Sequence, residues 1–297
     1  MKFNTLITIG VIVAITQGCA KKSTDSDTTS VSDTEAVVES GVSIVSGSLD
    51  EQSNASFAFS SEKVKSIWQT LLIDKAYAAG CSRAFLQTCT AGIREITYSN
   101  CSTPNSLKQM DGSVKLTYSN ASCSMTTDGD SVVRTYSTTI TGPRGGSISN
   151  SSDSAQDYRA TGAYGGGSKV TKTAAGYNLD IFGKHVKMEK NGRELFNVSV
   201  KSLTSLQVTG GLTRALRKVS NGQLEINHNI AKFTSVITAS NLQWSATCCH
   251  PTSGTLSITH SGSKTGTATV TFSADECGVA SLEENGQTSK IELSYCE

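Results

Sequence analysis

The chain has 297 residues, of which 17% are charged and 6% aromatic, and its formal net charge at pH 7 is +1. It contains 44 Ser, 36 Thr and 26 Gly but only 3 Pro. Threonine favours strands, whereas serine and glycine favour turns, so this composition argues against a helical cytosolic enzyme and allows one large β domain or two smaller ones.

The charge is divided unevenly along the chain. Residues 20–61 carry a net charge of −5, residues 62–297 carry +5, and no run of Lys or Arg concentrates the positive charge. Nucleic-acid binders gather their cations in a patch or a run. We therefore expect no nucleic-acid partner.

The first 18 residues have the layout of an export signal. Lys2 gives a basic start, Leu6–Ile15 is mostly apolar, and Gly18-Cys19 follows. This apolar run is too short to span a bilayer, which needs about 20 residues. The pattern predicts a secretory signal peptide over residues 1–18.

Gly18-Cys19 resembles the lipobox of bacterial lipoproteins. The resemblance implies cleavage before Cys19, palmitate-type acyl chains on its thiol and acylation of its new amine. Because Ala20 rather than Asp follows, the family's sorting rule implies the outer membrane. Two or three buried acyl chains, at about 0.8 kcal/mol per CH₂, anchor a protein stably. The alternative is an ordinary export signal followed by an incidental cysteine.

The cysteine count agrees with acylation. Nine cysteines are an odd number for an exported protein, and removing Cys19 leaves eight, enough for four disulfides. The eight are Cys81, Cys89, Cys101, Cys123, Cys248, Cys249, Cys277 and Cys296. The first four allow three pairings, among which the sequence does not choose.

Cys248 and Cys249 are adjacent, so in a strand they point to opposite faces. We expect them to pair with Cys277 and Cys296 rather than with each other. Because an oxidising compartment favours disulfides and the chain has no Cys-x-x-Cys pair, we expect no metal site and no cofactor.

Between the lipobox and the body, the sequence predicts two different segments. Residues 19–61 are acidic and rich in Ser and Thr, which predicts a disordered tether. Residues 62–80 carry Val64, Ile67 and Leu71 on one helical stripe, which predicts an amphipathic helix. We expect this helix to cover an open face of the sheet; docking on a partner or a lipid surface is the alternative.

Residues 81–297 are predicted to form a disulfide-stapled antiparallel β domain: a sandwich, an open barrel or a long twisted sheet. Apolar residues alternate with polar ones from about Ile93 onward, which is typical of strands with one wet face. The clearest alternating sets are Leu224/Ile226/His228/Ile230, Leu242/Trp244/Ala246/Cys248, Leu256/Ile258/His260, Ala268/Val270/Phe272 and Ile291/Leu293/Tyr295.

Turn residues separate these runs. Asn191-Gly192, Asn221-Gly222 and Asn285-Gly286 predict hairpin turns, because a type I′ turn needs positive φ at both central residues. Pro251–Gly254 predicts a further turn, and Lys264–Gly266 is expected in the turn of a hairpin.

No catalytic residue is predicted. His228 and His260 share the parity of apolar neighbours, so we expect hydrogen-bonded inward side chains rather than general bases. Ser60-x-x-Lys63 and Lys264-Thr265-Gly266 resemble motifs of serine β-lactamases and penicillin-binding peptidases. Those enzymes hold the serine on a large helical domain, for which this chain has no sequence pattern.

The complete layout of lipobox, acidic tether and cysteine-stapled β body resembles lipoproteins of predatory Gram-negative bacteria. The resemblance implies a surface or periplasmic position and no known activity. We expect a non-enzymatic binding or structural protein, anchored to the outer membrane through its acyl chains, with an envelope or surface ligand that is unknown. The alternatives are a carrier of lipid or lipoprotein with a concave sheet, and a hydrolase of envelope polymers with converging His and carboxylate groups.

Overall fold

The computed structural model describes residues 31–50, 89–102, 109–142, 145–152, 155–156, 163–164, 166–213 and 215–293. Within these ranges the chain forms one helix, α1 (Val31–Asp50), and fifteen strands. The strands are β1 (Ile93–Ser102), β2 (Gln109–Tyr118), β3 (Ser131–Thr141), β4 (Gly146–Ser151), β5 (Ala155–Gln156), β6 (Ala163–Tyr164), β7 (Gly167–Thr173), β8 (Gly176–Lys190), β9 (Arg193–Thr209), β10 (Lys218–His228), β11 (Phe233–Ser245), β12 (Cys248–Gly262), β13 (Gly266–Phe272), β14 (Val279–Glu284) and β15 (Gln287–Glu292).

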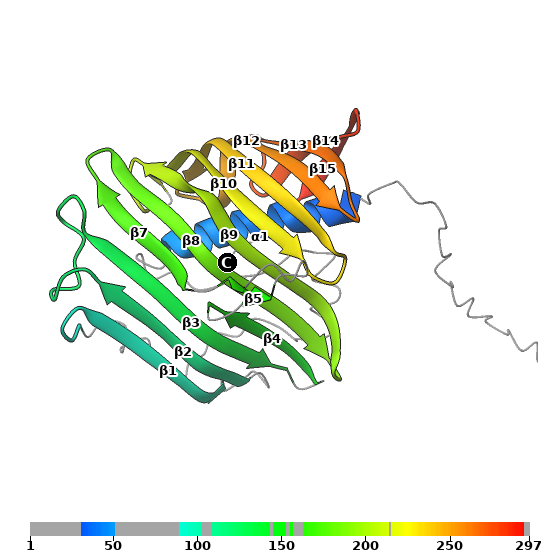
Figure 1. Cartoon of the computed structure of the whole chain (residues 1–297). Coiled ribbons are helices and arrows are strands. Elements are labelled where there is room, and N and C mark those ends of the chain that lie inside the picture. Colours follow the sequence, from blue (N-terminus) through cyan, green and yellow to red (C-terminus); the bar gives the residue numbers. More distant parts are fainter. Residues whose placement is uncertain are drawn as a thin grey trace, which may run out of the picture.

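Thirteen strands form one antiparallel sheet, in the order β1-β2-β3-β4-β8-β9-β10-β11-β12-β13-β14-β15, with β7 paired to β3 and β8. β5 and β6 form a separate ribbon beside β8 and β9. The mainly β prediction is confirmed. Of the three architectures that the sequence left open, the long twisted sheet is the one observed (Figure 1).

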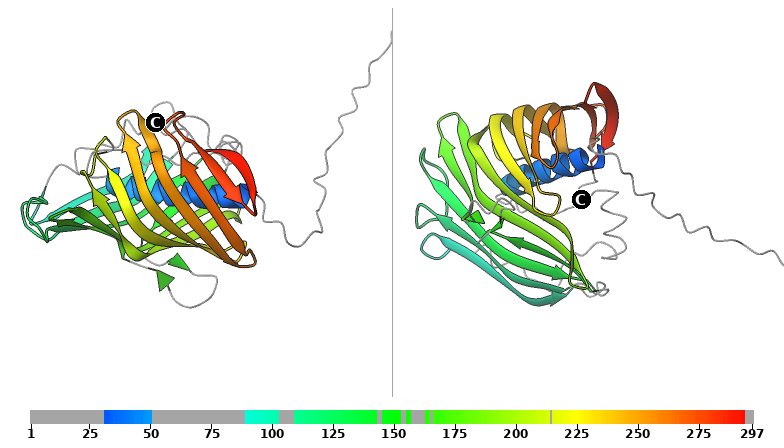
Figure 2. Two further views of the ribbon diagram at one scale, coloured as in Figure 1. Left: turned by 90° about the horizontal axis from the view of Figure 1, so that it is seen from above. Right: turned by 45° about the vertical axis from the view of Figure 1, so that its right-hand side comes forward.

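The half of the sheet from β10 to β15 curls around α1, which lies on its concave side, called here the inner face (Figure 2). The core follows the predicted alternation. Ile226, Ile258 and Val270 are at most 1% exposed, and all belong to one apolar cluster with the valines of α1. Ile230, by contrast, is 49% exposed, because β10 ends at His228 and Ile230 lies in the following turn.

Two of the predicted Asn-Gly turns are confirmed. Asn191-Gly192 joins β8 to β9, and Asn285-Gly286 joins β14 to β15. All four residues have positive φ, between 52° and 76°, as a type I′ turn requires.

Two other turn predictions are wrong. Asn221-Gly222 lies inside β10 and Pro251–Gly254 inside β12, each beside an irregularity of the strand register. A Cβ on Gly222 would lie 2.7 Å from the backbone of Leu206, so glycine is needed here for close packing of neighbouring strands. A bulge and a turn use the same residue types, and only the pairing of distant strands separates them.

The tether prediction is wrong for residues 31–50, which form α1. Val37, Val38, Val42, Val45 and Leu49 recur on one helical stripe and are at most 4% exposed. α1 is rich in Val, Ser and Gly, which are poor helix formers. Packing on the inner face therefore stabilises the helix more than propensity does. The helix predicted over 62–80 lies outside the described residues.

Gly41 is the point of closest approach between α1 and the sheet. A Cβ on this residue would lie 2.9 Å from Ile237 Cδ1 and 3.7 Å from Ile226 Cδ1. We expect Gly41→Ala to change the free energy of unfolding by no more than about 1 kcal/mol, because the gain in helix propensity opposes the crowding. Ile237→Val removes the crowded methyl. The double variant should therefore be more stable than the sum of the two single changes predicts, by about 0.5–1 kcal/mol.

Urea denaturation measures this coupling. The matched control combines Gly41→Ala with Ile258→Val, since Ile258 is also on the inner face but has no atom within 4 Å of the Gly41 site. Additive behaviour of Gly41→Ala with Ile237→Val would contradict the observed docking of α1.

Candidate functional site

A buried cluster of polar side chains lies where the first turn of α1 meets the inner face. Its members come from α1, β10, β12, the β12–β13 turn and β14, and all are at most 8% exposed. We call it the α1 cluster; it comprises Thr34, His228, His260, Lys264 and Glu284. It joins the start of the chain's described part to its last strands.

Thr34 is the centre of the α1 cluster. Its Oγ1 donates a hydrogen bond to Glu284 Oε1 at 2.9 Å and accepts one from Lys264 Nζ at 2.7 Å. Lys264 Nζ also lies 3.7 Å from Glu284 Oε1. His260 Nε2 is 3.4 Å from the same hydroxyl. These contacts tie the first turn of α1 to β12, β14 and the turn between β12 and β13.

The strand register explains how the sheet presents these groups. Ser235 on β11 is the register partner of His260 on β12, and Ser235 Oγ lies 2.8 Å from His260 Nδ1. Glu284 pairs with Ala268 on β13, so its side chain shares the buried face. Lys264 lies in the hairpin turn, as the sequence predicts, but its side chain is buried rather than solvated.

Phe233 separates the two imidazoles. His228 stacks on its ring with centroids 4.3 Å apart, and His260 meets it edge-on at 5.9 Å. Lys264 Nζ lies 5.5 Å from the centroid of the same ring. Two histidines and a lysine therefore surround one aromatic side chain in a buried site.

Burial lowers the pKa of His228 and of His260 to about 4, and the nearby Lys264 charge adds to the shift. Both imidazoles are therefore neutral at pH 7. The prediction that they point inward is confirmed. His260 is hydrogen-bonded as expected, but His228 Nε2 is a buried atom with no hydrogen-bond partner in the described part of the chain.

The chemistry available to the α1 cluster is limited by access. A carboxylate, an imidazole and an amine converge on one hydroxyl, which is the arrangement that a hydrolase would need. Thr34 is, however, 0% exposed, so no substrate reaches its hydroxyl while α1 is docked. In this state the cluster holds α1 on the sheet.

A second buried cluster lies toward β1. Arg134 Cζ and Lys184 Nζ lie 5.0 Å and 5.8 Å from the ring centroid of Tyr136. Burial lowers the pKa of Arg134 to about 9 and that of Lys184 to about 7, to which the Arg134 charge contributes. Burial also raises the pKa of Tyr136. The Tyr136 ring thus lies close to two buried cations, one from β3 and one from β8.

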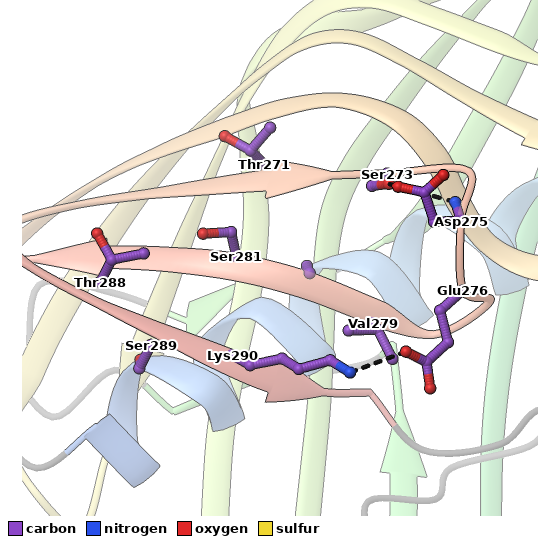
Figure 3. Close-up of a pocket in the computed structure, with 10 residues that line it drawn as sticks. Thr271, Ser273, Asp275, Glu276, Val279, Ser281, Thr288, Ser289 and Lys290 are labelled. Atoms are coloured by element: carbon purple, nitrogen blue, oxygen red, sulfur yellow. Dashed lines mark hydrogen bonds and ion pairs between the residues drawn. The ribbon is translucent and has the colours of Figure 1, made fainter.

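The outer face carries a shallow depression of about 440 Å³ over β13, β14 and β15 (Figure 3). Thr271, Ser281 and Thr288 line it with hydroxyl groups. Lys290 Nζ pairs with Glu276 Oε2 at 2.8 Å across one end, and Asp275, which accepts a hydrogen bond from Ser273, is the third charged group of the lining. An exposed pair of this kind contributes little to stability.

The predicted disulfide residues are partly within the described chain. Cys89 pairs with Cys123 and Cys248 pairs with Cys277, with Cα atoms 5.9 Å and 5.6 Å apart. The second pairing is one of those expected for Cys248. Cys101 is also disulfide-bonded. Four of the predicted positions lie outside the described residues: Cys19, Cys81, Cys296 and the side chain of Cys249.

Of the two β-lactamase-like motifs, Lys264-Thr265-Gly266 lies within the described residues. Lys264 contacts Thr34 and Glu284. Ser60 and Lys63 lie outside the described residues.

Sequence reasoning missed Thr34 and Glu284. Glu284 had a usable signal, because it shares parity with the buried Leu282 and Ala280. A carboxylate at an apolar position predicts a buried partner. Thr34 had no such signal.

Comparisons with known proteins add no family to this description. Within the described ranges, no group of three or more His, Cys, Asp or Glu side chains is placed to hold a metal ion, and no helix has the length and apolarity to cross a bilayer. A scan against protein-family models, a search of curated proteins and a search of solved structures each found no match.

Proposed function

We propose that the chain is a lipid-anchored protein of the bacterial cell envelope that acts by binding, or as a structural surface component, rather than by catalysis. The observation that carries the proposal is the oxidised state of Cys89, Cys101, Cys123, Cys248 and Cys277. Disulfides persist in oxidising compartments, which agrees with an export signal over residues 1–18. When the eight cysteines of residues 81–297 pair among themselves, Cys19 is the odd one and is available for acylation.

The position of α1 sharpens the proposal. Val31, the first residue of α1, follows Cys19 by twelve positions. A chain of that length spans at most about 40 Å. An acylated Cys19 with α1 docked therefore keeps the sheet close to the membrane, rather than at the end of a long tether.

Intact mass of the membrane-extracted protein tests this proposal. We expect the native chain to begin at Cys19, to carry acyl chains, and to gain two hydrogens per disulfide on reduction. Cys19→Ser should lose the acyl mass. Ala20→Asp is the matched control: it should keep the acyl mass and move to the inner membrane. A native chain that begins elsewhere without acyl groups, or that carries free thiols throughout, would overturn the proposal.

A second candidate, a carrier of apolar ligands, is favoured by one observation: α1 covers an apolar concave face as a separate element. Trp244, 5% exposed and part of the same core, is a natural probe once Trp68→Phe removes the other tryptophan. Saturable change of its fluorescence with oleate, but not with acetate, would support the carrier. No change with oleate would exclude it.

A further inference from the structure

α1 is held on the sheet by two kinds of contact. Its apolar stripe, Val38, Val42, Val45 and Leu49, packs on the inner face. In its first turn, Thr34 adds hydrogen bonds with Glu284 and Lys264 and lies 3.4 Å from His260 Nε2. Apolar packing is non-directional, whereas the contacts of Thr34 depend on the protonation state of their partners. The α1 cluster is therefore a part of the docking interface that can respond to a change in conditions.

The charges that face the two imidazoles come from the β12–β13 turn and from β14. Lys264 contributes one positive charge and Glu284 one negative charge, while Thr34, the member of the cluster from α1, is neutral. The neighbours of His228 on β9 and β11, Phe196 and Phe233, are apolar. With both histidines neutral the cluster is balanced; with both protonated it carries two uncompensated positive charges beside Lys264.

We propose that α1 is an acid-released plug: protonation of His228 and His260 breaks the α1 cluster, frees the first turn of α1 and opens the inner face of β10–β14. The sheet itself is expected to stay folded, because its strands are held by their own ladders and by Cys248–Cys277. This inference does not depend on acylation of Cys19.

The direction of the effect follows from the two pKa values. Both histidines have a pKa of about 4 when α1 is docked, below the ordinary value of 6.5 that an exposed imidazole would regain. The undocked state therefore binds more protons, and docking weakens as the pH falls from about 6.5 to about 4. At pH 4.5 each histidine that regains its ordinary pKa on undocking should weaken docking roughly 50-fold relative to pH 7.

Hydrogen exchange of the full mature chain, corrected for the intrinsic pH dependence, tests the proposal. We expect the amides of α1 to lose protection between pH 6.5 and 4 while the amides of β10–β14 keep theirs. The variant His228→Phe/His260→Gln should keep α1 protected through this range. If it does not fold, His228→Phe alone preserves the ring stack on Phe233. This single variant should remove the contribution of one of the two histidines to the loss of α1 protection.

His185→Gln is the matched control. His185 bonds Asn197 on β9 and is not part of the α1 cluster, so its replacement should leave the pH profile of α1 unchanged. Three results would each overturn the proposal: α1 stays protected at pH 4.5 in the native chain, α1 and the sheet lose protection together, or the double variant behaves as the native chain does.

Discussion

Replacing Glu284 with leucine is expected to lower the free energy of unfolding by about 3–5 kcal/mol at pH 7. Glu284 is 8% exposed, accepts the Thr34 hydroxyl and faces Lys264, which is 5% exposed. The variant removes the carboxylate that lies 3.7 Å from a buried ammonium. Lys264 then keeps a buried ammonium without that carboxylate, so less of its desolvation cost is offset.

Urea denaturation measures the effect, and a double variant identifies its cause. Glu284→Leu/Lys264→Met replaces the ion pair with apolar side chains, so most of the lost stability should return. Glu283→Leu is the control, since Glu283 is the exposed neighbour on the same strand and should change stability by less than about 0.5 kcal/mol. If the double variant were as unstable as the sum of its single changes, the ion pair would not be the cause.

Removing the Cys248–Cys277 disulfide is expected to lower the free energy of unfolding by about 3–4 kcal/mol. The two cysteines are 29 positions apart, so the bond closes a loop containing the β12–β13 hairpin and the start of the path to β14. Opening that loop raises the conformational entropy of the unfolded chain. Cys248→Ala/Cys277→Ala, compared with the native chain in urea without reductant, measures the difference.

The Cys89–Cys123 bond, with a separation of 34 positions, provides the comparison. Its entropic contribution should be similar, but it lies beside β1, at one edge of the sheet. Hydrogen exchange in Cys89→Ala/Cys123→Ala should therefore rise mainly in β1–β3, whereas loss of Cys248–Cys277 should affect β12–β14. An effect below about 1 kcal/mol for Cys248–Cys277 would contradict the loop-closure account.

Strand content was predictable because it depends on neighbours in sequence. Alternation such as Leu256/Ile258/His260 identifies one face of a strand without knowledge of its partner, and that face is buried as expected. Turn positions were only partly predictable. Asn191-Gly192 and Asn221-Gly222 have the same residues, yet one ends a strand and the other interrupts its register.

The position of α1 was also not predictable from local sequence. Residues 31–50 contain scattered apolar residues at low density and many poor helix formers, which is the composition of a disordered segment. They become helical where a concave apolar face accepts Val37, Val38 and Val42. No window of sequence around α1 contains that face, because β10–β14 begin at Lys218.

Local patterns were thus sufficient for a mainly β chain, for inward-facing His228 and His260, and for the partner set of Cys248. The α1 cluster could be recognised only in the folded chain. Thr34 lies 226 positions from His260 and 250 from Glu284, and their contact depends on how the sheet curls around a helix. Alternation and turn signals report each residue's own surroundings, whereas a buried polar cluster depends on which distant surfaces meet, and that is settled by the packing of the whole chain.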